Sequence, residues 1–405
     1  MPSVLILTQY YPPETGAPQN RLSSLAWHLQ KLGMEVSVLT AMPNYPAMKI
    51  KEGYEGKWYH QETIDSITVH RSWIFVKKTN SVALRLLNYF SFVFSSLFVA
   101  LFKLKKYDIV ICESPPLFLG ISALGIKFFK GSKLVFNVSD LWPESAEKLG
   151  IVSNRFFLNI AYRLEARLYK SAVLVSGQTQ GIVASIHTRF PKVKTHWLPN
   201  GIDTARLNNT VNNNWRKENG IAIDDFMVLY AGILGHAQAL EVILKAASLL
   251  NDNSIKFVFA GDGPQREYLE NLMKELGLDN VIFLGNIPTE QMPAIINACD
   301  TAVVPLKNIL LFKGAIPSKI FENLAFSKPI LLGVDGEAKE LFIDQGNCGL
   351  FFTPDNEHEL AQAILKLKNS VGLRTTLGNN GKKYVHEKFD RQTIAYNFYN
   401  ELLKV

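Results

Sequence analysis

The chain has 405 residues, 47% of them hydrophobic and 20% charged, which is enough for two domains of ordinary size. Its three cysteines, Cys112, Cys299 and Cys348, are far apart and form no metal-binding or redox spacing. We expect them to be buried and reduced, as in a cytosolic protein. The N-terminus has no basic region before its apolar run, which predicts a first strand and not a signal peptide.

The net charge of +7 is unevenly distributed along the chain. Residues 1–203 carry +10, whereas residues 204–405 carry −3. A basic first half indicates an anionic partner for that half, and nucleic acid, a membrane surface and a lipid phosphate are all candidates.

Short apolar strands alternate with helical patterns in the first half. Asn20–Leu32 has apolar residues at helical spacing and is followed by Gly33, which is typical of a helix end. The predicted strands are Val4–Thr8, Val36–Thr40, Ile109–Cys112, Leu134–Val138 and Ala172–Ser176. Nearly continuous apolar strands separated by helices indicate a parallel sheet that is covered on both faces.

The pattern restarts after the turn at residues 198–203 and an Asn-rich segment at residues 206–220, which is typical of a linker or a surface excursion. The predicted strands are Met227–Tyr230, Lys256–Ala260, Val281–Leu284, Thr301–Val304, Ile330–Leu332 and Leu350–Phe352, with helices at Ala239–Leu250 and Pro264–Leu276. We therefore predict two doubly wound α/β domains, 1–203 and 204–405, with the ligand site in the cleft between them. The last helix, Arg391–Lys404, is amphipathic and could pack at many places, including back on the first domain.

One apolar stretch interrupts this alternation. Leu86–Phe102 contains no charged residue, and basic residues flank it on both sides. Its length is marginal for a membrane span, which needs about 17–25 residues. We expect a helix that lies in the membrane interface, and the alternative is a core helix of the first domain.

The stretch from Leu310 to Pro329 combines features of an anion site and a sugar site. Lys313 and Lys319 flank a turn at Pro317 and Ser318, and a helix with Ser318 as its predicted cap follows. A helix N-terminus and a lysine suit a phosphate, and Glu322 one turn later could accept hydrogen bonds from sugar hydroxyls. These features predict a nucleotide-sugar site. The alternative is a capped helix with a solvated Lys–Glu face.

Other candidate residues follow the predicted strands. Asp140 and Glu144 lie just beyond Leu134–Val138, where a carboxylate pair could act as acid and base, or Ser139 and Asp140 could simply cap a helix. Glycine-bearing turns that could contact a phosphate or a base, or only turn the chain tightly, contain Gly16, Gly232, His236, Gly261, Asp262 and Gly263. No GxGxxG motif follows the first strand, which argues against a nicotinamide oxidoreductase. No Asp-x-Asp occurs, which argues against a metal-held diphosphate.

The sequence resembles the retaining glycosyltransferases of family four over nearly its whole length. The motifs that carry the resemblance are YYPPETGAPQNRL, LPNGID, FVFAGDGPQREYLE and VPLKNILLFKGAIPSKIFENLAFSKPI. SPPLFLG and DLWPESAEKLG are similar to one branch, the L-fucosamine and fucosyl transferases of bacterial O-antigen, capsule and exopolysaccharide assembly. The resemblance implies the GT-B fold, in which two Rossmann-like domains face each other.

The donor motif departs from the family in three places. A Glu that the family places seven residues before a second Glu is Gly314 here, and Glu322 matches the second. The Arg and Lys that hold the donor diphosphate in the family are Ile233 and Gln238. We expect Lys313 and Lys319 to supply the missing charge.

The resemblance implies sugar transfer, with retention, from a nucleotide-sugar to a polyprenyl-diphosphate-linked saccharide at the inner face of the cytoplasmic membrane. We expect a UDP-linked donor, with an N-acetylated 6-deoxyhexosamine such as L-FucNAc as one possible sugar, no metal or other cofactor, and no nucleic-acid partner. The catalytic candidates are Asp140 and Glu322; the donor-binding candidates are Gly16, Gly232, His236, Gly261, Asp262, Gly263, Lys313, Pro317, Ser318, Lys319 and Glu322; and the acceptor-side candidates are Glu14, Glu113 and Glu144. The alternatives are a catalytically silent nucleotide-sugar-binding or scaffold subunit and a nucleotide-sugar epimerase.

Overall fold

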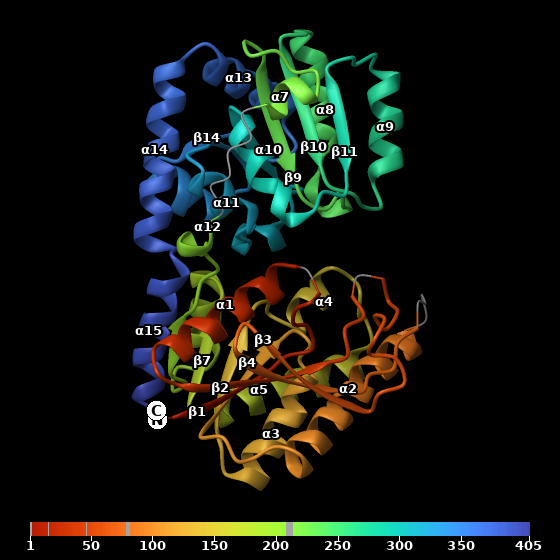
Figure 1. Cartoon of the computed structure of the whole chain (residues 1–405), viewed down its shortest axis with the longest axis vertical. Helices are drawn as coiled ribbons and strands as arrows, with labels where there is room; N and C mark the ends of the chain where they lie inside the picture. The colour runs from red at the N-terminus through yellow and green to blue at the C-terminus, as the bar shows by residue number, and fades with distance from the viewer. Residues whose placement is uncertain (1, 15, 46, 78–81, 208–213) are drawn as a thin grey trace. The chain divides into compact units, whose positions relative to one another are not determined.

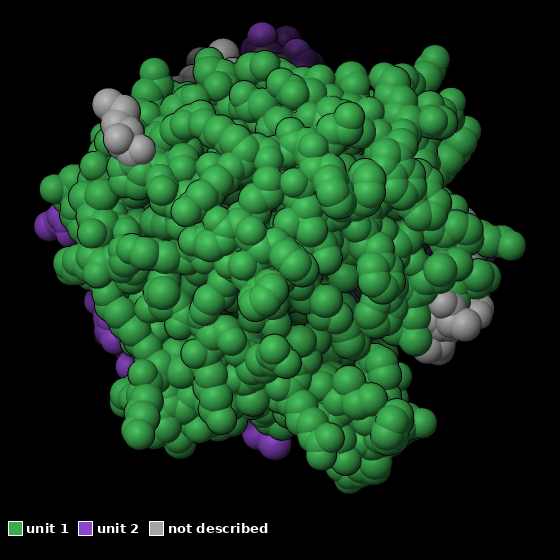
Figure 2. Space-filling model, turned by 90° about the horizontal axis from the view of Figure 1, so that it is seen from below, with its two compact units in different colours: residues 1–200, 391–405 green, residues 201–390 purple. Residues whose placement is uncertain are grey.

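The structure is a computed structural model that describes residues 2–14, 16–45, 47–77, 82–207 and 214–405 (Figure 1). The chain divides into two compact units, residues 1–200 with 391–405 and residues 201–390 (Figure 2). Each unit is a largely parallel sheet covered by helices, so the α/β class expected from the sequence is confirmed. The division falls after Asn200, and the last helix belongs to the first unit.

The first unit contains an eight-stranded sheet in the order β3-β4-β2-β1-β5-β6-β7-β8. All neighbouring strands are parallel except β3, which pairs antiparallel with β4 at the sheet edge. The strands are β1 Ser3–Leu7, β2 Glu35–Ala41, β3 Tyr59–Ile64, β4 Ile67–Ser72, β5 Ile109–Ser114, β6 Lys133–Val138, β7 Leu174–Gly177 and β8 Thr195–Trp197. The helices are α1 Ala17–Lys31, α2 Val82–Phe102, α3 Leu119–Lys130, α4 Glu144–Lys148, α5 Arg155–Ser171, α6 Gln180–Arg189 and α15 Arg391–Leu403.

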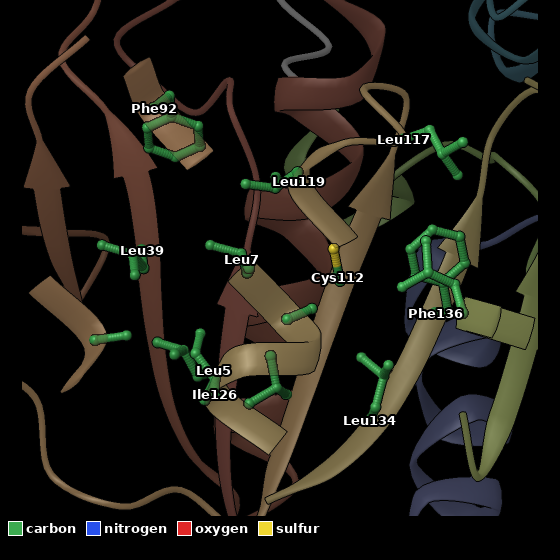
Figure 3. Close-up of a cluster of buried hydrophobic side chains, with 14 of the residues drawn as sticks. Leu5, Leu7, Leu39, Phe92, Cys112, Leu117, Leu119, Ile126, Leu134 and Phe136 are labelled. Atoms are coloured by element: carbon green, nitrogen blue, oxygen red, sulfur yellow. The ribbon is translucent and has the colours of Figure 1, made fainter. Parts of the chain in front are cut away.

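Alternate residues of each central strand point to opposite faces of this sheet, and different helices cover the two faces. Leu5 and Leu7 of β1 pack in a core with residues of α2, α3 and α5 (Figure 3). Val4 and Ile6 pack on the other face with residues of α1 and α15. The last helix therefore completes the second layer of the first unit, which explains why the chain returns to it after residue 390.

The second unit contains a six-stranded parallel sheet in the order β11-β10-β9-β12-β13-β14. Its strands are β9 Phe226–Ala231, β10 Ile255–Ala260, β11 Val281–Gly285, β12 Thr301–Pro305, β13 Ile330–Gly333 and β14 Gly349–Phe351. Its α-helices are α7 Trp215–Glu218, α8 Glu241–Leu250, α9 Arg266–Glu275, α10 Met292–Ala298, α11 Lys319–Ala325, α12 Glu337–Lys339, α13 Glu357–Lys368 and α14 Val371–Lys388, and its short 3₁₀ and π segments are Thr204–Arg206, His236–Gln238, Thr289–Gln291, Leu310–Gly314 and Glu340–Gln345.

Most predicted elements are present within one to three residues of their expected ends, and three strands were not predicted. β3, β4 and β8 lie at or beside the edges of the first sheet. Edge strands carry more polar residues than central ones, so their apolar signal is weak. The expected linker is wrong in part, because residues 215–218 form α7 with a buried Trp215. Residues 208–213 of that segment lie outside the described residues.

The expected membrane helix, Leu86–Phe102, lies within α2 and has two unlike sides. Phe92 and Val99 are buried in the core of the first unit, whereas Phe94 and Phe98 are 68% and 48% exposed. The prediction that the whole stretch is interfacial is therefore wrong for the side that carries Phe92 (Figure 3). Among the helices that the structure describes, none is long and apolar enough to cross a bilayer.

Candidate functional site

Each sheet has a point at which its strand order reverses. In the first unit this point lies between β1 and β5, and in the second it lies between β9 and β12. Loops that follow such neighbouring strands diverge to opposite faces and leave a crevice, which is where ligands bind in open α/β sheets.

Two glycine turns pack against each other beside the crevice of the second unit. The Leu234 amide donates to the Asp262 carbonyl at 2.9 Å, and the Gln265 amide donates to the Leu234 carbonyl at 2.9 Å. A Cβ on Gly261 would lie 1.9 Å from the Gly232 oxygen, and one on Gly263 would lie 2.5 Å from the Leu234 oxygen. Close packing of the two loops therefore requires glycine at positions 261 and 263. This agrees with the alternative that these glycines only turn the chain tightly. Gly232, in contrast, is exposed.

Lys319 brings a positive charge to that exposed glycine. Its Nζ atom lies 3.8 Å from the centroid of the Tyr230 ring, and a methyl group on Gly232 would come within 3.0 Å of it. Desolvation by burial lowers the pKa of Lys319 to about 7, although the nearby Glu322 carboxylate opposes the shift. A lysine in this state is poised to gain a proton when an anion binds beside it.

Glu322 lies on α11, one turn after Lys319, and its side chain is exposed. Pro317 and Ser318 form the preceding turn, in which their carbonyls accept from the amides of Ile320 and Phe321. The prediction that the Ser318 side chain caps the helix is wrong, because that side chain makes no capping hydrogen bond. Since α11 has only seven residues, the ammonium of Lys319 is a stronger anion-binding group than the helix end.

The remaining donor-side candidates have local partners. The Lys313 ammonium forms an ion pair with Asp335 at 2.8 Å, which leaves Lys319 as the better candidate for the missing diphosphate charge. Asp262 is exposed and accepts from the Gly263 amide at 2.7 Å. His236 is exposed, and its Nδ1 atom lies 2.5 Å from the side-chain amide nitrogen of Gln265.

Glu14 lies against a pocket of about 610 Å³ in the first unit, beyond the carboxyl ends of β1 and β2. Its carboxylate is buried and accepts from the backbone amides of Asn44 at 2.7 Å and Tyr45 at 2.8 Å. Burial raises the pKa of Glu14, although these amide hydrogen bonds oppose the shift. Gly16, which follows in the same loop, immediately precedes α1.

A buried ion pair lies at the crevice of the first unit. Arg21 of α1 contacts Glu113 of β5 at 2.5 Å and donates to the Ser139 hydroxyl at 2.8 Å. Glu113 also accepts from Ser139 and from the Asn137 amide at 2.6 Å. The Glu113 carboxylate accepts hydrogen bonds from three side chains and is less than 5% exposed. It therefore holds the loops that follow β5 and β6 in place and is not accessible to an acceptor substrate.

Asp140 and Glu144, the predicted carboxylate pair, each have a local partner in the structure. Asp140 is exposed and accepts from the Ser145 hydroxyl at 2.5 Å, in the manner of a local helix-start contact. Glu144 forms an ion pair with Lys148 at 2.6 Å on the surface of α4. Asp140 therefore stays a candidate through its place beside Ser139, and Glu144 has a local structural role.

The structure adds groups that the sequence analysis missed. Arg21, Tyr230 and Asp335 become part of the sites only through strand order, so no local pattern marks them. All three cysteines are buried and free of disulfides, as expected. Within the described ranges, no group of His, Cys, Asp and Glu side chains could hold a metal ion.

Comparison with known proteins agrees with this architecture. Residues 211–384 match the family "Glycosyl transferases group 1", and residues 16–201 match "Glycosyl transferase 4-like domain". The colanic acid biosynthesis glycosyl transferase WcaI of Escherichia coli is 24% identical over 98% of this chain and 99% of its own. An N-acetyl-D-galactosaminyltransferase of Campylobacter jejuni, named for a diNAcBac-PP-undecaprenol-linked acceptor, is 32% identical over 39% of this chain and 42% of its own.

Solved structures show the same fold. Sucrose-phosphate synthase from Thermosynechococcus elongatus has a TM-score of 0.76 at 17% identity, with both chains fully covered. HepE of Anabaena, solved with UDP-glucose, has a TM-score of 0.73 at 19% identity, also with full coverage. The two family matches, the WcaI relative and these folds agree with one another: the chain is a glycosyltransferase of the GT-B fold.

Proposed function

We propose that the enzyme transfers a sugar from a UDP-linked donor to a polyprenyl-diphosphate-linked saccharide in bacterial surface polysaccharide biosynthesis, with retention of the anomeric configuration. The observation that supports a UDP-linked donor is the position of the Lys319 ammonium, beside Gly232 and Tyr230 at the β9/β12 crevice. A diphosphate at this position would meet a cation and an exposed backbone, and Tyr230 would hold the lysine in place.

Glu322 would bind the sugar of the donor. It lies one turn from Lys319 on the same short helix, so a sugar attached to a diphosphate at Lys319 would come within reach of its carboxylate. An exposed carboxylate accepts charged hydrogen bonds from two hydroxyl groups. We expect no metal requirement in this arrangement, because Lys319 would neutralise part of the diphosphate charge.

Relatives support the pathway and the acceptor class. WcaI is named for colanic acid biosynthesis, and the Campylobacter enzyme is named for an undecaprenol-diphosphate acceptor. The motifs SPPLFLG and DLWPESAEKLG favour an N-acetylated 6-deoxyhexosamine such as L-FucNAc as the transferred sugar. The anomeric outcome is tested by NMR of the new linkage, in which inversion would contradict retention.

The first unit would hold the enzyme at the inner face of the cytoplasmic membrane. Helices α2 and α3 pack together and expose the aromatic side chains of Phe94, Phe98, Phe102, Phe128 and Phe129. Exposed aromatic residues beside lysines favour an anionic membrane surface, and Lys103, Lys105, Lys106, Lys127 and Lys130 lie in or after these helices.

Donor binding is tested by thermal shift with a panel of nucleotide-sugars, since a bound ligand raises the melting temperature by mass action. We expect one UDP-sugar to stabilise the wild type and to have little effect on Lys319→Ala, while Lys313→Ala responds as the wild type. Equal shifts in Lys319→Ala would overturn the donor site. Membrane binding is tested separately by sedimenting the protein with anionic vesicles. The wild type should sediment with them, and the triple variant Phe94→Ser/Phe98→Ser/Phe102→Ser should remain in the supernatant.

A further inference from the structure

Two neighbouring pockets of unlike chemistry lie at the carboxyl edge of the first sheet. The larger, of about 610 Å³, is lined by polar and charged groups that include Glu14, Asn44 and Lys51. The smaller, of about 250 Å³, is lined by apolar and aromatic groups that include Met42, Trp58 and Trp73. Both are lined by Ile50, so the polar pocket borders the aromatic one.

A row of aromatic rings leads from the smaller pocket onto α2. Trp73 stacks on Trp58 with ring centroids 5.4 Å apart, and Trp58 meets the edge of Phe98 at 6.4 Å. Phe98 in turn lies 4.8 Å from Phe102. These four side chains are 38% to 70% exposed, so within the described residues the row is an apolar surface open to solvent.

Charged groups lie in and between the two pockets at one end of this row. Lys49 and Lys51 line the larger pocket and Lys57 lines the smaller, and among the described residues none of their ammonium groups forms an ion pair. Glu52 and Glu55 also line the larger pocket, together with the buried Glu14. Lysines and carboxylates together suit a ligand head that has both phosphate and hydroxyl groups.

We propose that this surface, from the larger pocket across Trp58 and Trp73 to Phe98 and Phe102, is a binding track for the acceptor. The saccharide would lie in the larger pocket, the diphosphate beside Lys51 and Lys57, and the first isoprene units on the aromatic row. The track rests on the proposed function, because it deepens the assignment of a polyprenyl-diphosphate acceptor to the first unit.

The shape of the surface distinguishes a single chain from a bilayer. Trp58 and Trp73 line a hollow together with Met42 and Ile74, and a hollow encloses one apolar chain. Phe128 and Phe129 of α3 are 81% and 66% exposed and contact each other, but they line neither pocket and are not part of the row that reaches Trp58. The α3 pair is therefore a matched control for aromatic exposure without the hollow.

The experiment uses farnesyl diphosphate as the probe, with inorganic diphosphate as its counterpart without a chain, and measures binding by calorimetry on the full chain. We expect farnesyl diphosphate to bind wild type and Phe128→Ala/Phe129→Ala equally, and Trp58→Ala/Trp73→Ala at least tenfold more weakly. Inorganic diphosphate should bind all three proteins alike. Trp58→Leu/Trp73→Leu, which keeps the surface apolar, should recover part of the affinity and guards against loss of folding in the alanine variant.

The track would be overturned if farnesyl diphosphate bound the wild type and Trp58→Ala/Trp73→Ala with equal affinity. It would also be overturned if the wild type bound farnesyl diphosphate and inorganic diphosphate with equal affinity. Loss of vesicle sedimentation in Trp58→Ala/Trp73→Ala with unchanged farnesyl diphosphate binding would likewise reject it, and would assign the tryptophans to the bilayer. Donor binding at the second unit is measured on the same variants. Failure there, with the probe result intact, would reject the proposed function and not the track.

Discussion

The state of Lys319 gives a testable dependence of donor affinity on pH. Burial lowers the pKa of this lysine to about 7, so in the free enzyme its charged form predominates below neutral pH and disappears above it. An anion that binds beside Nζ favours the charged form. Raising the pH therefore weakens binding, and above pH 7 each binding event takes up a fraction of a proton.

The size of the effect follows from the ionised fraction. With a pKa of about 7, that fraction is about one half at pH 7, about one tenth at pH 8 and about one hundredth at pH 9. If only the charged lysine binds, the Kd for UDP rises by about fivefold from pH 7 to 8 and by up to about tenfold from pH 8 to 9. The phosphates of UDP do not contribute, because they are ionised above about pH 7.

Calorimetry of UDP binding in buffers with different ionisation enthalpies measures both the Kd and the proton uptake. Lys319→Arg keeps its charge at every pH tested and should show a flat profile without proton uptake. Lys313→Ala, which removes the lysine that pairs with Asp335, should keep the slope of the wild type. A Kd that is constant from pH 7 to 9, or a slope that persists in Lys319→Arg, would refute this reasoning.

Four further predictions concern single side chains and metal ions. Glu322→Gln keeps the shape of the side chain but loses a charged acceptor, so kcat/KM should fall roughly 10- to 100-fold, and an unchanged value would remove Glu322 from the donor site. Transfer should continue in excess EDTA, and a loss that magnesium or manganese restores would show that a metal is needed. Glu113→Gln leaves the Arg21 charge buried without its partner and should lower the free energy of unfolding by about 3–5 kcal/mol in urea titration, whereas a change below 1 kcal/mol would mean that the pair is dispensable. Phe92→Ser should lower the free energy of unfolding by about 3–5 kcal/mol, because Phe92 is buried, whereas Phe94→Ser should leave it nearly unchanged. Equal losses in the two variants would contradict the two-sided packing of α2.

Local sequence pattern was sufficient for the alternation of strands and helices. Central strands such as β1 and β5 are buried on both faces, so their apolar runs are continuous and easily recognised. The edge strand β3 reads YHQETI, and its residues are only half-buried or exposed, which leaves little apolar signal. The resemblance to known transferases added what periodicity does not contain, namely the class of reaction.

The arrangement of the site depends on strand order, which no local pattern contains. Gly232 and Lys319 are far apart in the sequence and meet because β9 and β12 are neighbours in the sheet. The lysine was predicted to supply the missing diphosphate charge, but its contact with Tyr230 became visible only in three dimensions. The same holds for α2, in which Phe92 and Phe94 are alike in sequence and differ only in what packs against them.

The most direct test of the proposed reaction follows the transferred sugar. Membranes from cells that lack the enzyme but assemble the acceptor are incubated with the labelled nucleotide-sugar that thermal shift identifies, together with wild type or Glu322→Gln. We predict that wild type moves label into an organic-extractable lipid from which mild acid releases a saccharide, and that Glu322→Gln does so roughly 10- to 100-fold more slowly. Label found only as free sugar in the aqueous phase, or in lipid at the same rate with both proteins, would contradict the proposal.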